Sequence, residues 1–129
     1  MGIIAVLVAA FAGFAVGAVW YMMLAKPWMA AAEVRVGPDG RPEGGALPYV
    51  LSAIAMVLVA GMMRHVFALS AVDSWDKGLI SGLGIGLFFI SPWIMINNAY
   101  AGRPFRLTLI DGGYAVIGCA VIGLVLTLF

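Results

Sequence analysis

The sequence predicts an all-α membrane protein, a bundle of four antiparallel transmembrane helices in a single domain over residues 1–129. Of these residues 64% are hydrophobic and only 10% are charged, whereas a soluble domain carries about 25% charged residues. A chain with so few charges could not cover a globule with solvated groups. Four apolar runs have the length of about 20 residues that a helix needs to span a bilayer. Short connections between sequential runs favour antiparallel neighbours.

The first run has no basic segment before it and is too long for the apolar part of a signal peptide, so we expect it to span the membrane. The longest connection, residues 25–46, contains a turn signal at Gly37-Pro38-Asp39-Gly40. The helices are expected at about residues 3–24, 47–69, 78–100 and 108–129.

Pro92 interrupts the third run. Proline has no N–H group, so it would leave the carbonyl group of Phe88 without its helical donor. The Ser91 hydroxyl or a neighbouring helix is expected to donate to that carbonyl. Two interpretations stay open, a fixed kink that packs the helices and a hinge that gates a path through them.

The distribution of basic residues predicts the orientation, because cytoplasmic connections carry an excess of Lys and Arg. Two basic residues, Lys77 and Arg64, belong to the second connection or its flank. The first and third connections hold the other five, which are Lys26, Arg35, Arg41, Arg103 and Arg106. This excess predicts that these two connections lie inside and that both termini lie outside.

Small residues recur four positions apart, which is the spacing that lets membrane helices approach closely. Two interpretations stay open, a subunit interface of a homo-oligomer and packing inside one bundle. The stripes are Gly13 and Gly17 in the first run, Gly78, Gly82 and Gly86 in the third, and Ala115, Cys119 and Gly123 in the fourth.

Polar residues gather at the predicted inner end of the bundle. Lys26 ends the first helix, Asn97 and Asn98 end the third, and Asp111 lies near the start of the fourth. We expect Lys26, Asn98 and Asp111 to form one polar cluster that could receive a cation or a basic small molecule. The alternative is capping of helix ends, since the spacing of Thr108 and Asp111 resembles a capping box.

Arg64 and His65 form the second candidate site. Arg64 lies 17 residues after the expected start of its helix, which places it near the outer edge of the bilayer. The alternative places both side chains in a polar cavity, where His65 could act in proton-linked transport. At about 1.5 Å per residue, Arg64 and Asp111 differ by about 20 Å in depth, so we expect no salt bridge between them.

Three segments together resemble the DUF1761 family: "GFAVGAVWYMMLAKPWM" at residues 13–29, "INNAYAG" at 96–102 and "LTLIDGGYAVIG" at 107–118. The chain has Leu24-Ala25 where the family usually has Phe-Gly before the lysine. The resemblance implies a small four-span protein of the bacterial inner membrane, and it implies no substrate or reaction. Its most recognisable residues are Gly17, Trp20, Tyr21, Lys26, Trp28, Asn98, Asp111 and Tyr114.

Composition also bounds the function. A net charge of +1 without clustered basic residues argues against binding of nucleic acid. His65 is the only histidine and Cys119 the only cysteine, so one subunit cannot supply a three-histidine zinc site or a bis-histidine haem site. We therefore expect no metal and no cofactor, and a membrane enzyme or a haem carrier is the least supported function. The function that the sequence favours is that of a homo-oligomer with a structural or accessory role. The alternative is a small transporter or channel with an inner vestibule around Asp111.

Overall fold

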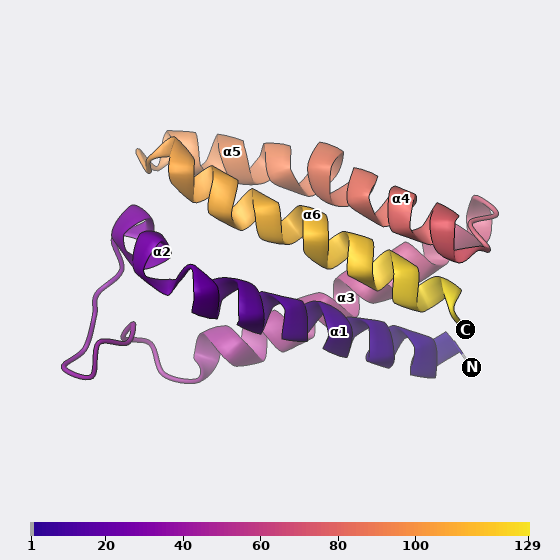
Figure 1. The fold of residues 1–129 in the computed structure, drawn as a ribbon, viewed down its shortest axis with the longest axis horizontal. Coiled ribbons are helices and arrows are strands. Elements are labelled where there is room, and N and C mark those ends of the chain that lie inside the picture. Colours follow the sequence, from indigo (N-terminus) through magenta and orange to yellow (C-terminus); the bar gives the residue numbers. More distant parts are fainter. Residues whose placement is uncertain (1) are drawn as a thin grey trace.

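The computed structural model describes residues 2–129 and is built from long helices (Figure 1). Four stretches are long and apolar enough to cross a membrane, and the third is a continuous run over Trp75–Tyr100. The predicted all-α membrane fold is therefore confirmed. In chain order the elements are α1 (Gly2–Met23), α2 (Ala25–Ala32), α3 (Leu47–Leu69), α4 (Trp75–Ile85), the π-helical segment η1 (Gly86–Ile90), α5 (Ser91–Tyr100) and α6 (Phe105–Thr127).

The four stretches alternate in direction, so both ends of the chain lie at the same end of the bundle (Figure 1). We call this the terminal end, and it also holds the α3–α4 turn at residues 70–74. The opposite end holds α2 and the connections at residues 33–46 and 101–104, and we call it the connection end.

Helix α6 is the centre of the packing. It contacts α1 on one side and the α4–α5 helix on the other, while α3 packs mainly on α1. The expectation that short connections join direct neighbours holds for α5 and α6. It is wrong for α3 and α4, because α3 packs mainly on α1 and α4 packs mainly on α6. The reason lies in the contact faces. Ala60 and Met63 of α3 belong to the core cluster with Ala9 of α1, whereas α4 presents glycines to α6.

The glycine stripe of the third span faces α6 inside the chain. A methyl group added at Gly78, Gly82 or Gly86 would overlap a backbone carbonyl oxygen of α6, at Gly123, Cys119 and Ala115 respectively. Such contacts bring two helix backbones together and gain dispersion energy, which is the role of small residues in membrane helices. These residues are buried, so this stripe is not available as a subunit interface.

The α1 stripe is also covered within the chain. A methyl group at Gly13 would lie 2.8 Å from the Cδ1 atom of Ile122, and one at Gly17 would lie 2.7 Å from the hydroxyl of Tyr114. Both stripes therefore pack against α6. Of the two interpretations, packing inside one bundle describes them, and a subunit interface does not.

Two helix starts differ from the prediction. The third span begins at Trp75 instead of 78. The last helix begins at Phe105, directly after Pro104, whose extended backbone ends the connection. Thr108 is thus inside α6 and cannot be its N-cap. The capping-box interpretation of Thr108 and Asp111 is wrong, and Asp111 lies about 9 Å along the helix from its first residue.

The distortion expected at Pro92 takes the form of the π-helical segment that precedes it. The backbone N–H of Ser91 donates to the carbonyl of Gly86, five residues earlier. The Ser91 hydroxyl was expected to donate to the carbonyl of Phe88. It donates instead to the same Gly86 oxygen at 2.7 Å and to the Gly112 oxygen of α6 at 3.1 Å. A π segment is a recognised cause of helix distortion and is frequent at functional sites.

Candidate functional site

A carboxylate inside a membrane span is the most unusual group of the connection end. Asp111 is half-buried in α6, and its Oδ1 atom accepts a hydrogen bond of 2.6 Å from the hydroxyl of Tyr21. The two residues meet because α1 and α6 are antiparallel neighbours. Tyr21 lies two residues before the end of α1, and Asp111 lies six residues after the start of α6.

Aromatic rings surround this hydrogen bond. The Tyr21 ring makes edge contacts with Trp28 of α2, at a centroid distance of 5.8 Å, and with Tyr114 of α6, at 5.5 Å. The Tyr114 hydroxyl donates to the Gly13 carbonyl at 2.9 Å, which fixes the ring against α1. We call Tyr21, Trp28, Asp111 and Tyr114 the Asp111 cluster.

The backbone on either side of Asp111 is held by the two neighbouring helices. The indole N–H of Trp20 in α1 donates to the carbonyl of Ile110 at 2.8 Å. The Ser91 hydroxyl of α5 reaches the carbonyl of Gly112 at 3.1 Å. The segment of α6 that carries the carboxylate is therefore positioned from both sides, and one of these contacts comes from the distorted part of the third span.

The expected cluster of Lys26, Asn98 and Asp111 is not the one observed. Asn98 donates its side-chain hydrogen bond to Thr108 at 3.1 Å, and Asn97 is exposed. Lys26 is exposed and makes no hydrogen bond or ion pair with Asp111 within residues 2–129. The observed cluster differs from the expected one for two reasons. Lys26 belongs to the separate short helix α2 and not to the end of α1, and α6 begins at Phe105, three residues earlier than expected.

Arg64 and His65 are both exposed on α3, five and four residues before its end. They lie at the terminal end and not in the interior of the bundle. A methyl group added at Gly2 would lie 2.8 Å from the guanidinium carbon of Arg64, so this side chain rests on the start of α1.

No salt bridge joins Arg64 to Asp111 in the part of the chain that the structure describes. The ion pairs found there are Lys77 with Asp73 and Arg103 with Glu33. The second pair links residue 33, just after α2, to the α5–α6 connection. It therefore joins two parts of the connection end.

Three members of the cluster were missed by reasoning from charge and depth. Tyr21, Trp28 and Tyr114 are among the recognisable residues of the family resemblance, which is the one signal in the sequence that could have indicated them.

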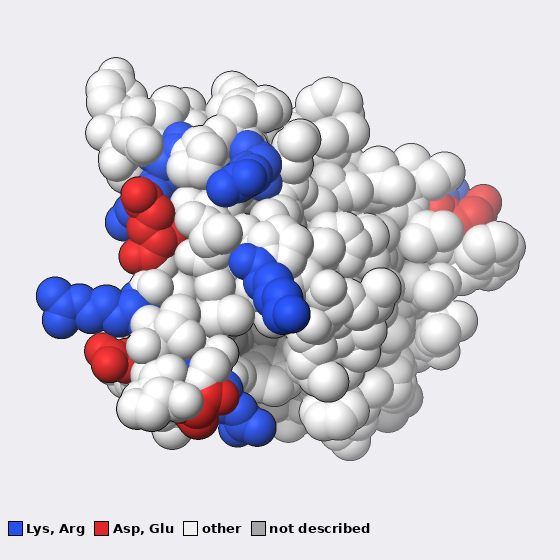
Figure 2. Space-filling view, turned by 60° about the vertical axis from the view of Figure 1, so that its left-hand side comes forward, with Lys and Arg blue, Asp and Glu red and all other residues white. Residues whose placement is uncertain are grey.

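Charged side chains gather over the connection end, while most of the remaining visible surface is uncharged (Figure 2). A carboxylate next to aromatic rings can attract an organic cation through charge and through the electron-rich ring faces.

Comparison with known proteins places the chain in one family. The family model described as "Protein of unknown function (DUF1761)" matches residues 4–127. No curated protein and no solved structure matches the chain. The match covers all four candidate spans except for two residues at the start of α1. The chain therefore belongs to the DUF1761 family of proteins of unknown function.

Proposed function

We propose that this protein binds a small organic cation at the Asp111 cluster and acts as a small transporter or channel for that cation in the bacterial inner membrane. One observation carries the proposal. Asp111 lies within a membrane span, and its hydrogen-bond partner in the structure is the neutral hydroxyl of Tyr21 and not a basic side chain.

The energetics favour a positively charged ligand at this place. Ionisable groups within a span are costly and usually mark ion or substrate pathways, and a partner charge reduces the cost of a buried carboxylate. Lys26 is not in contact with Asp111, so a proton or a ligand cation would supply the positive charge. A group that binds either one can exchange a proton for a cation, which is the chemistry of proton-linked transport.

The donor set indicates the class of cation. A small metal ion such as calcium prefers six to eight oxygen ligands, and no group of three or more His, Cys, Asp or Glu side chains suited to a metal occurs in residues 2–129. The Asp111 cluster instead combines one carboxylate with the rings of Tyr21, Trp28 and Tyr114. Aromatic rings attract alkylated ammonium ions at about 0.5–2 kcal/mol for each well-placed contact.

The orientation belongs to the same proposal. Five of the seven basic residues lie at the connection end, which is the end that holds the Asp111 cluster. By the excess of basic residues we propose that this end faces the cytoplasm and that both termini face outward. The cluster would then form the inner mouth of the path.

A ligand-dependent stability screen tests the proposal. The purified full chain in detergent is heated with tetraethylammonium, tetraphenylphosphonium, ethidium or sodium chloride, and unfolding is followed. We expect one or more of the three organic cations to raise the unfolding temperature of the wild type but not of Asp111→Asn. Glu43→Gln removes one exposed acid elsewhere at the connection end and is the matched control. Equal stabilisation of all three proteins would contradict the proposal.

A structural role as a homo-oligomer is the second candidate function. Since the glycine stripes are covered by α6, this candidate now depends on another face. An apolar groove of about 250 Å³ between α1 and α3 favours it, and its lining includes Phe11, Phe14 and the small residue Ala53. Ala53→Leu would fill the groove. A change of the oligomer to monomer in that variant would support the candidate, and an unchanged mass would contradict it.

A further inference from the structure

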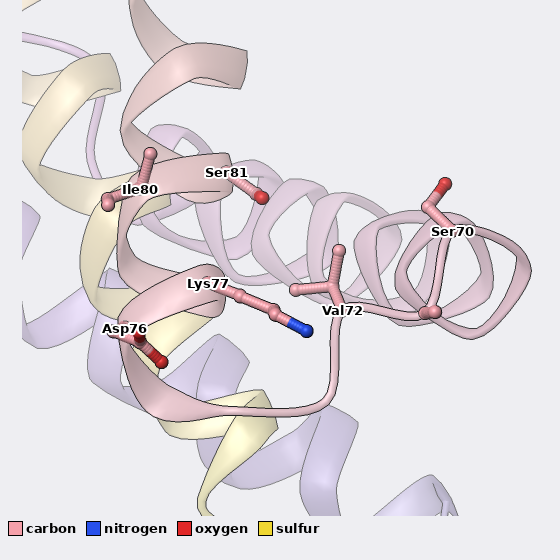
Figure 3. Close-up of a pocket in the computed structure, with 7 residues that line it drawn as sticks. Ser70, Val72, Asp76, Lys77, Ile80 and Ser81 are labelled. Carbon is pink, nitrogen blue, oxygen red and sulfur yellow. The ribbon is translucent and has the colours of Figure 1, made fainter.

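A hollow of about 390 Å³ lies at the terminal end, between the α3–α4 turn and the first turns of α4. Figure 3 shows that the Lys77 ammonium group and the Ser81 hydroxyl both extend from α4 into the space beside Val72. The hollow combines groups that donate hydrogen bonds with apolar side chains. It is lined by Ser70, Ala71, Val72, Asp76, Lys77, Ile80 and Ser81.

The place of this hollow determines what can reach it. It lies where a membrane span meets its connecting turn, and the exposed Trp75 beside it is typical of the membrane–water interface. Below it, Ile80, Leu83 and Leu87 are exposed at helical spacing on one face of the span. A ligand with a polar head and an apolar tail would therefore find its head in the hollow and its tail along this face.

The charges of the hollow and of Asp73, which lies beside it as the partner of Lys77, suit a zwitterion. Lys77 is paired with Asp73 at 3.3 Å, but both side chains are more than half exposed. An exposed pair of this kind contributes little to stability, so Lys77 can turn to a phosphate without a large loss. Asp73 and Asp76 together outnumber Lys77 by one charge. This excess opposes an anionic headgroup and favours one that carries its own ammonium group.

We propose that the hollow binds the headgroup of a phospholipid with a primary ammonium group, as in phosphatidylethanolamine. Lys77 and Ser81 contact the phosphate, and Asp76 or Asp73 accepts hydrogen bonds from the ammonium group. A trimethylated headgroup cannot donate such bonds, and an anionic one lacks the positive charge. The order of affinity is therefore phosphatidylethanolamine, then phosphatidylcholine, then phosphatidylglycerol.

Native mass spectrometry of the full chain in detergent tests this order with the three lipids added at equal concentration. Lys77→Gln lowers binding of phosphatidylethanolamine by about fivefold or more, since it removes a charge-assisted contact. Arg106→Gln makes the same charge change on an exposed side chain at the connection end and leaves this binding unchanged. Asp76→Asn shifts the preference toward phosphatidylglycerol.

Circular dichroism establishes that each variant keeps its helices, and Ser81→Ala replaces Lys77→Gln if that variant does not fold. Equal binding by the lysine and arginine variants would overturn the proposal, as would a preference of the wild type for phosphatidylglycerol. If millimolar inorganic phosphate displaces the lipid, the hollow is a site for a free anion, and the proposal that a lipid occupies it is wrong.

Discussion

The hydroxyl of Tyr21 and the carboxylate of Asp111 are joined by a hydrogen bond of 2.6 Å that links α1 to α6 across 90 positions of the chain. Tyr21→Phe keeps the ring and its edge contacts and removes only this donor. We expect the variant to lose about 0.6–2 kcal/mol of stability, the range measured for hydrogen bonds between membrane helices. Unfolding in a detergent titration measures the loss. Tyr49→Phe, which removes a hydroxyl on the exposed side of α3, is the control, and equal stability of the two variants would contradict the role of this bond.

Gly82 and Gly84 offer a matched pair within α4. A methyl group at Gly82 overlaps the backbone of Cys119, whereas one at Gly84 meets nothing within 4 Å. Gly82→Ala should therefore destabilise the chain by about 1–3 kcal/mol, the usual cost of overpacking. Gly84→Ala should be neutral or slightly stabilising, because alanine favours a helix over glycine. Thermal unfolding compares them, and a Gly82→Ala protein that stays stable but loses an oligomer would show that the stripe acts between subunits.

Ser91 connects the distorted part of the third span to the backbone beside Asp111. Ser91→Ala removes the donor that reaches the carbonyls of Gly86 and Gly112. We expect a loss of about 0.6–2 kcal/mol and faster hydrogen exchange in residues 86–91. The comparison is Ser52→Ala, whose hydroxyl bonds only within its own helix, to the carbonyl of Pro48. An unchanged rate of hydrogen exchange at residues 86–91 in Ser91→Ala would mean that this hydroxyl does not stabilise the π segment.

The proposed orientation can be measured by labelling. Single cysteines at Gly40 and Ser74, in a Cys119→Ser background, lie at the connection end and the terminal end. A reagent that does not cross the membrane should label position 74 in intact cells and position 40 only after lysis. Labelling of position 40 from outside would reverse the orientation.

The spans could be predicted from the sequence because each is an apolar run bounded by turn residues. The second run matches α3 at both ends, Leu47 and Leu69. The start of α6 was missed because Phe105-Arg106 at its first turn carries a charge, and an apolar scan does not include it. Helix α2 was missed for a related reason, since eight residues with a proline are too short to show a clear period.

The candidate site was predicted only in part, since its centre, Asp111, was expected but its partners were not. Depth along the chain brings Lys26, Asn98 and Asp111 to one end of the bundle, but depth does not say which way each side chain points. The direction depends on the rotation of α1 and α6 about their axes, which their close packing through Gly13 and Gly17 determines. That packing turns Tyr21 of α1 toward the carboxylate, whereas Lys26 belongs to the separate helix α2.

Direct binding of an organic cation to the wild type and to Asp111→Asn tests whether the Asp111 cluster is a cation site. Isothermal titration of tetraphenylphosphonium into each purified protein gives the two dissociation constants, with Glu43→Gln as the control for a lost negative charge. We expect Asp111→Asn to bind at least about tenfold more weakly, equivalent to about 1.4 kcal/mol, and Glu43→Gln to bind like the wild type. Equal affinity of the wild type and of an Asp111→Asn protein that keeps its helices would show that Asp111 does not form a cation site.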